Sequence, residues 1–297
     1  MPRLHTYYLG RVIKIGNLDS DKIYEAIKSP KAFYWYGSGW SFFDAEVKER
    51  SGISYIAGRL SKFDPKAEVV ISDPQAQKES IQPEPNMRVA SSHFVYIPSV
   101  SGIAFSKASP HIEEYSFPHR FSSVIKHTHE DFFVDCDIKL IADLKTFAEK
   151  LMTLEGIYRI SANLNPPNPI FHPLWKPLKD YMKQRRSDKM LIREEAQGGD
   201  PLHTDLPKIV DAMSKQTKDN KFEYEGELPV GDAAILMAAD GYGSGHVKGS
   251  QNGEKVIIKT SETNRHFAFD EEPSNDALFE EAYMILKDIE DERHLEH

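Results

Sequence analysis

The sequence predicts an α+β fold: a mixed, largely antiparallel sheet with packed helices, divided into two sub-domains. Two patterns favour this class. Runs of β-branched and aromatic residues between Gly, Pro and Asn recur along the chain, as is typical of strands. Segments with apolar residues at helical spacing alternate with them. Of the 297 residues, 40% are hydrophobic, which is enough to build a core well beyond the limit for small domains.

The first segments alternate between strand and helix patterns. Residues 4–15 predict a strand, and Asp19 then has the position of a helix N-cap. The aromatic-rich residues 33–64 predict strands again. Residues 73–86 are polar and contain three prolines, a composition that predicts a loop or linker.

The middle of the chain predicts a hairpin followed by a compact unit. Residues 92–107 form two β-type runs that turn near 99–102, and a helix is expected from about Phe121. A strand at 132–138, a helix at 140–151 and a strand at 157–164 come next. This strand–helix–strand order indicates a crossover packed on one sheet.

The proline-rich loop at 165–169 is a natural boundary between two domains. It divides the chain into residues 1–165 and 166–294. The last residues, 295–297, resemble the start of a cloned His-tag and are interpreted as a tag remnant.

The second part predicts three helices, a hairpin and a closing helix. The helices are expected at 172–184, 206–214 and 232–239. Asn252 and Gly253 lie between two β-type runs, the strongest short hairpin signal. An acidic amphipathic helix closes the chain.

Charge and composition place constraints on location and partners. The net charge is −9, and no window has the length and apolarity of a membrane span or signal peptide. Cys136 is the single cysteine, so no intramolecular disulfide and no cysteine zinc site can form. These features predict a cytoplasmic protein without a membrane span.

One segment reverses the acidic balance and predicts a nucleic-acid contact. Between Lys176 and Arg193 seven basic residues face two acidic ones, a net charge of +5. Cations at three- and four-residue spacing share one helix face, and Trp175 and Tyr181 are adjacent aromatics. The predicted phosphate-binding residues are Lys176, Lys179, Lys183, Arg185, Arg186 and Lys189. The alternative is a solvated helix face, or one that docks against the acidic C-terminal helix.

Two short patterns resemble half of a metal-dependent nuclease centre. One comprises Asp135, Asp137 and Lys139; the other comprises Asp44, Glu46 and Lys48. Such a centre needs carboxylates that converge on Mg²⁺ or Mn²⁺ and a lysine near the attacking water. The alternative is a solvated strand face, because acidic-x-Lys triplets occur by chance in a charged chain. No cofactor is predicted outside this nuclease alternative.

His127 and His129 form an HxH pair followed by acidic residues. On a strand the two imidazoles would point to the same side, as ligands of one metal ion must. The alternative is a polar turn that leads into the next strand.

The order of several stretches resembles a known family. The hairpin FVYIPSVSGIAFSK, the unit IKLIADLKTFAEKLMTLEGIYRISANL, the loop NPPNP, a late Asn-Gly hairpin and a closing helix are similar to the RexA-like phage-exclusion proteins. They are also similar to an uncharacterised bacterial family found near phage-defence and toxin–antitoxin genes. The resemblance implies a two-part, dimeric α+β protein that binds DNA or responds to phage nucleic acid without an established catalytic centre.

Together these observations predict a phage-defence protein that binds nucleic acid, DNA more than RNA, without catalysis. It would act as a sensor or as the DNA-bound component of a defence system. One alternative is a metal-dependent nuclease toxin. Another is a protein-binding partner in a toxin–antitoxin or defence complex, whose acidic C-terminal segment docks a basic protein from the same operon.

Overall fold

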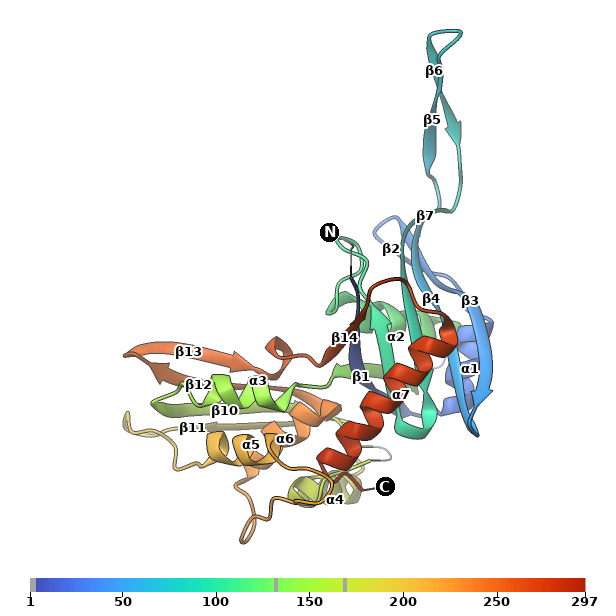
Figure 1. Cartoon of the computed structure of the whole chain (residues 1–297). Coiled ribbons are helices and arrows are strands. Elements are labelled where there is room, and N and C mark those ends of the chain that lie inside the picture. Colours follow the sequence, from blue (N-terminus) through green and yellow to red (C-terminus); the bar gives the residue numbers. More distant parts are fainter. Residues whose placement is uncertain (1–3, 131–132, 168–169, 297) are drawn as a thin grey trace.

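The computed structural model describes residues 4–130, 133–167 and 170–296. These residues form seven α-helices and fourteen strands, arranged in two lobes and one protruding arm (Figure 1). Each strand pairing within the three sheets is antiparallel. The predicted α+β class with a largely antiparallel sheet is therefore confirmed.

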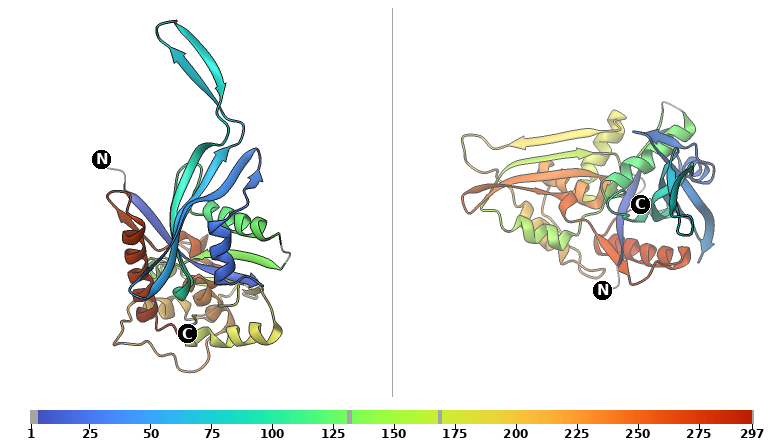
Figure 2. Two further views of the ribbon diagram at one scale, coloured as in Figure 1. Left: turned by 90° about the vertical axis from the view of Figure 1, so that its right-hand side faces the viewer. Right: turned by 90° about the horizontal axis from the view of Figure 1, so that it is seen from above.

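The first lobe is built on an eight-stranded, curled sheet (Figure 2). Its strands follow the order β14 (His266–Phe269), β1 (His5–Gly16), β8 (Gly102–Ser106), β7 (Met87–Ile97), β4 (Ile53–Asp64), β3 (Ser38–Arg50) and β2 (Phe33–Trp35). The eighth, β9 (Val134–Leu140), pairs with the second half of β1, beyond β14. Strand β1 therefore has neighbours along both of its edges.

Helices cover both faces of this sheet (Figure 2). On one face, α1 (Ser20–Lys28) and α2 (Ser116–His129) share a core with the sheet. On the other face, α7 (Asn275–Glu292) packs its apolar side against the strands. Asp19 is the N-cap of α1, as predicted, since its carboxylate accepts a hydrogen bond from the Lys22 amide at 2.8 Å.

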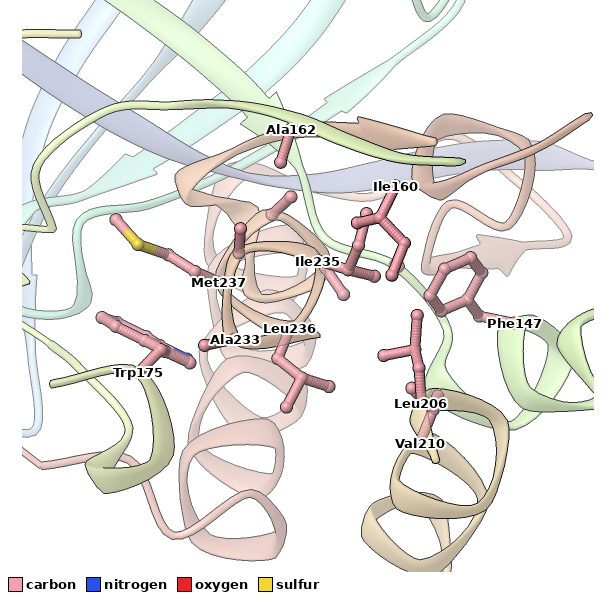
Figure 3. Close-up of a cluster of buried hydrophobic side chains, with 14 of the residues drawn as sticks. Phe147, Ile160, Ala162, Trp175, Leu206, Val210, Ala233, Ile235, Leu236 and Met237 are labelled. Atoms are coloured by element: carbon pink, nitrogen blue, oxygen red, sulfur yellow. The ribbon is translucent and has the colours of Figure 1, made fainter. Parts of the chain in front are cut away.

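The second lobe is built on a four-stranded sheet with helices on one face. The strand order is β11 (Met190–Glu195), β10 (Gly156–Leu164), β12 (Gly243–Gln251) and β13 (Glu254–Lys259). The helices that share its core are α3 (Leu144–Leu151), α4 (Lys176–Arg185), α5 (Leu206–Ser214) and α6 (Val230–Met237). Figure 3 shows α6 at the centre of this core, between the sheet and the neighbouring helices.

Short turns connect several of these elements. They are η1 (Pro98–Val100), η2 (Pro173–Trp175), η3 (Ala238–Tyr242) and η4 (Thr260–Glu262). Asn252 and Gly253 close the β12–β13 hairpin with φ angles of 52° and 76°, so the predicted Asn-Gly hairpin is confirmed.

The segment predicted as a loop at 73–86 belongs to a hairpin instead. Strands β5 (Glu68–Asp73) and β6 (Lys78–Pro83) pair as an arm that protrudes from the first lobe (Figure 1). The prolines lie in the turn, at the end of β6 and beyond it, where a missing N–H disturbs the ladder little. The prediction was wrong because it took the prolines as evidence against a strand.

The two sheets do not divide the chain at residue 165. Strand β10 ends at Leu164 but pairs with β11 and β12 of the second lobe, while β14 and α7 return to the first lobe. Glu296, assigned to the tag remnant, forms a bridge with Phe171. Residues 168, 169 and 297 lie outside the described residues.

A buried polar cluster joins the two lobes. The Arg293 guanidinium from the end of α7 donates to the Asp240 carboxylate at 2.8 Å and to the Ala142 carbonyl. Trp175 Nε1 donates to the other oxygen of Asp240 at 2.9 Å. Trp175, one of the two aromatic residues adjacent to the predicted phosphate contacts, is fully buried and cannot stack on a base. Its indole is a structural element of this cluster.

Within the described residues, no helix has the length and apolarity needed to cross a membrane.

Candidate nucleic-acid interface

The predicted basic helix exists as α4, and its charged side faces solvent. Leu178 and Met182 are buried against the second lobe, which places Lys176, Lys179 and Lys183 on the outer side. Two of these cations have partners within the chain. Lys176 is paired with Asp180, and Lys179 lies 3.3 Å from the centre of the Phe171 ring.

The remaining cations of the segment are exposed. They are Lys183, Arg185, Arg186 and Lys189, and none of them has an ion pair within the described residues. Arg186 ends α4 in the left-handed conformation, with φ 53°. The chain then turns directly into β11, the edge strand of the four-stranded sheet. The basic segment therefore leads onto this sheet.

The strand register places further cations on the side of the sheet that faces away from the helices. Ile160 and Ala162 point into the core, so their neighbours Arg159 and Ser161 point outward. Residues directly opposite each other share a face. The outward rows are Glu195–Arg159–Lys248–Ile257, Arg193–Ser161–His246–Lys259, and Leu191–Asn163–Ser244, with Lys255 opposite Ser250 at the rim. We call this surface the open face.

The open face is strongly cationic. Arg159, Arg193, Lys248, Lys255 and Lys259 come from four different strands and lie on one surface. The carboxylate of this face, Glu195, is shared between Arg159 and Arg193. Glu262 lies 3.8 Å from Lys259 at the edge. The positive charges therefore exceed the negative ones.

His246 lies near the centre of the open face and responds to these charges. Its pKa is lowered by partial burial first, and then by Arg159, Lys259 and Arg193. The part of the shift that comes from the three cations agrees with a positive field on this surface. The side chains of the three rows and of Lys255 include no Phe, Tyr or Trp, so the surface is suited to contact phosphates rather than to stack bases.

The two predicted nuclease sets do not form a site where carboxylates converge. Asp137 is paired with Lys139 at 2.7 Å and Asp135 with Lys126 at 3.1 Å. Across the described residues, no group of three or more His, Cys, Asp or Glu is arranged to hold a metal ion. These strand residues are engaged in local ion pairs.

The second set forms a link between β3 and α7. Lys48 lies between Glu46, at 3.2 Å, and Asp276 at the start of α7, at 3.1 Å. Tyr55 also donates a hydrogen bond to Asp276 at 2.6 Å. Asp44 has a positive φ of 52° at an irregularity of the β3–β4 pairing. This arrangement anchors the helix to the sheet.

The histidine pair lies on a helix, in the segment where a helix was expected from about Phe121, so the strand geometry that a shared metal ion would need is not present. His127 and His129 belong to the last turn of α2, where residues two apart point in different directions. The His127 ring contacts Phe33 edge-on at 5.9 Å, and His129 Nε2 is bonded to the Lys22 carbonyl at 2.9 Å. They do not converge on one ion. Asp131, next in the sequence, lies outside the described residues.

A separate cavity of about 680 Å³ lies beside the N-terminal end of α3. Lys150 and Arg265 line it together with Asp143 and Glu262, and Arg265 is paired with Asp143 at 2.7 Å. The opposite charges offset each other, so this cavity has no preference for an anion.

The sequence alone missed the cations of the open face. Arg159, Lys248, Lys255 and Lys259 are distant from the basic segment along the chain, and the strand pairing brings them beside it. Their local signal is the alternation of polar and apolar residues in 244–250 and 255–259. That signal identifies which residues of one strand point outward, but not which strands lie beside it.

Fold and surface together define a two-lobed α+β protein with a cationic, helix-free sheet face. The chain belongs to the family described as domain of unknown function DUF4747, whose profile matches residues 22–227, more than half of the sequence. No curated protein matches the chain.

Proposed function

We propose that this protein binds nucleic acid through the open face and the adjoining basic segment. The observation that carries the proposal is that the basic segment and the open face adjoin and form one cationic surface. Lys183, Arg185, Arg186 and Lys189, which have no recorded counter-ion among the described residues, lead into a sheet surface with five further cations. A rigid array of this kind neutralises several phosphates at once and releases their counterions.

The surface favours the sugar–phosphate backbone of a duplex over unpaired bases. Four strands span about 15 Å at the usual strand spacing, wide enough to contact several successive phosphates. The open face has exposed aliphatic side chains at Leu191 and Ile257 but offers no aromatic platform. Binding of this type has little dependence on base sequence. The net charge of −9 means that a nucleic acid is attracted by local cationic surfaces and not by the protein as a whole.

The resemblance to RexA-like proteins supports the biological part of the proposal. In that role the chain is a cytoplasmic, homodimeric component of phage defence that prefers DNA to RNA, either as a sensor or as a DNA-bound subunit. If the chain is a sensor, a partner protein from the same operon would respond to its binding of nucleic acid. We assign no reaction and no cofactor to the interface.

Fluorescence anisotropy with a labelled DNA duplex tests the proposal. The variant Lys248→Gln/Lys255→Gln removes two open-face charges that have no recorded ion pair in the described chain. It should weaken duplex binding about ten-fold at physiological salt and reduce the salt slope by about two. The matched control is Lys208→Gln/Lys215→Gln, which removes two exposed charges from α5 and should leave both values unchanged.

Equal losses in the two variants would mean that the net charge of the protein, and not the open face, attracts the probe. Absence of binding by the wild type would contradict the proposal outright. Gel analysis of the probe with and without Mn²⁺ belongs in the same experiment. Metal-dependent shortening of the probe would assign the protein to the nuclease alternative.

A further inference from the structure

The hairpin of β2 and β3 in the first lobe presents consecutive aromatic side chains to solvent. Tyr34, Trp35 and Tyr36 are 59%, 47% and 91% exposed, and Phe43 further along β3 is 45% exposed. Trp35 stacks on Phe33 at 6.1 Å and meets Tyr36 edge-on at 5.0 Å. We call residues 33–43 the aromatic hairpin. Burial in the core does not account for these rings.

The backbone at the tip shows that Tyr36 is not the residue that folding alone would favour. Trp35 and Ser38 are paired across a two-residue turn, in which Tyr36 and Gly37 have φ angles of 45° and 75°. Both positions of such a turn need positive φ, which Asn and Gly adopt easily and an aromatic residue rarely adopts. A strained, exposed aromatic residue points to a functional role.

Cations are interleaved with these rings. The Arg120 guanidinium lies 5.5 Å from the centre of the Trp35 ring and 5.1 Å from that of Trp40, and Lys62 lies 5.9 Å from Trp40. Arg88 lines a small cavity beside Phe43. In the described part of the chain, none of these three cations forms an ion pair with a carboxylate. Arg88 is exposed, although Asp44 lines the same cavity, and Arg120 and Lys62 are half-buried against the rings.

We infer that the aromatic hairpin binds unpaired bases of single-stranded nucleic acid. Exposed rings stack on bases of any identity, and neighbouring cations contact the phosphates between them. The aromatic hairpin is separate from the open face, whose three rows contain no Phe, Tyr or Trp, so the two sites would recognise different features of a nucleic acid. Aromatic and arginine side chains are also common at protein interfaces, but cations without carboxylate partners favour a polyanion.

Two oligonucleotide probes of equal charge separate base stacking from phosphate attraction. One is oligothymidylate, and the other is an abasic deoxyribose-phosphate oligomer of the same length. Wild-type protein should bind oligothymidylate about five-fold or more tightly than the abasic oligomer, because stacking on one base accounts for a factor of that size. The intact full-length chain is used throughout.

The variant Tyr36→Asn tests the inference because it removes an exposed ring and should keep the fold. Asn suits the turn better than Tyr, so the melting temperature should stay the same or rise while the preference for oligothymidylate falls. Trp35→Phe supplies a second readout. Trp35 is the exposed tryptophan, whereas Trp40 and Trp175 are buried, so quenching of fluorescence by oligothymidylate should disappear in Trp35→Phe while binding persists.

Several results would overturn the inference. Equal affinity of the wild type for the two probes would exclude stacking. The hairpin would be excluded as the binding site if a stable Tyr36→Asn variant kept the preference for oligothymidylate and if oligothymidylate still quenched the fluorescence of Trp35→Phe. Loss of a protein partner in Tyr36→Asn, without any base preference in the wild type, would assign the surface to a protein. The open-face variant Lys248→Gln/Lys255→Gln should keep the preference, so failure of the duplex site and failure of this site are distinguishable.

Discussion

Substitution of Asp240 by Asn should destabilise the protein strongly, although it only replaces one carboxylate oxygen by an NH₂ group. Asp240 accepts hydrogen bonds from Arg293 at 2.8 Å and from Trp175 at 2.9 Å, and all three side chains are buried. The Asn side chain has one acceptor oxygen instead of two. If that oxygen faces Trp175, the amide NH₂ group meets the guanidinium, which leaves the Arg293 charge buried without a counter-ion.

Loss of one partner from a buried ion pair costs about 3–5 kcal/mol. At about 2–4 °C per kcal/mol for a chain of this size class, the melting temperature should fall by roughly 6–20 °C. Circular dichroism melts and urea titrations of the wild type and Asp240→Asn measure both quantities. The matched control is Asp291→Asn, which breaks the exposed pair with Lys218 and should cost at most about 1 kcal/mol.

A loss below about 1 kcal/mol for Asp240→Asn would refute the reasoning, since it would mean that the Arg293 charge is compensated elsewhere. The double variant Asp240→Asn/Arg293→Met adds a second check. Removal of both charges leaves no buried ion without a partner, so this variant should be more stable than Asp240→Asn alone.

Three further predictions concern other parts of the chain. Replacement of Lys183, Arg185 and Arg186 together by Gln should lower the salt slope of duplex binding by about two to three; an unchanged slope would remove the segment from the interface. Replacement of residues 68–83 by a short Gly-Ser turn should leave the melting temperature within about 2 °C, because an isolated hairpin adds little stability; a larger fall would show that the arm packs on the body. Burial raises the pKa of Asp232 to about 6 from its usual 3.8, so its stabilising contribution is complete below about pH 4 and is lost as the pH rises through 6. Asp232→Asn should therefore gain stability relative to the wild type between pH 4.5 and pH 8, and a difference in melting temperature that is constant with pH would contradict this.

Local sequence signals were sufficient where neighbouring residues determine the structure. The carboxylate of Asp19 caps its own helix, and the Asn252-Gly253 turn sets the register of its own hairpin. The predicted helix at 206–214 coincides with α5. In each case the interactions that decide the conformation lie within a few residues.

The remaining features depend on contacts between distant segments. Ser161 is opposite Arg193 on one side and His246 on the other, and no short window of sequence contains this information. Trp175 is next to a basic helix in sequence but is held in the core by Asp240. The HxH spacing of the histidine pair would suit two ligands on a strand, but both residues lie in the last turn of α2. Long-range pairing between strands therefore determines the surface that we propose as the binding site.

The stretch of chain that matches the family profile is shorter than the stretch that the two sheets need to be complete, and β1 is one of the strands outside the match. The family match begins at residue 22, after β1, and ends at residue 227, before β12, β13, β14 and α7. A fragment cut to those limits would leave β8 and β10 each with a bare edge and the α7-covered face of the sheet open to water, which favours aggregation. During synthesis β1 is made long before β14, with which it pairs, so closure of the first lobe waits until β14 and α7 have been synthesised.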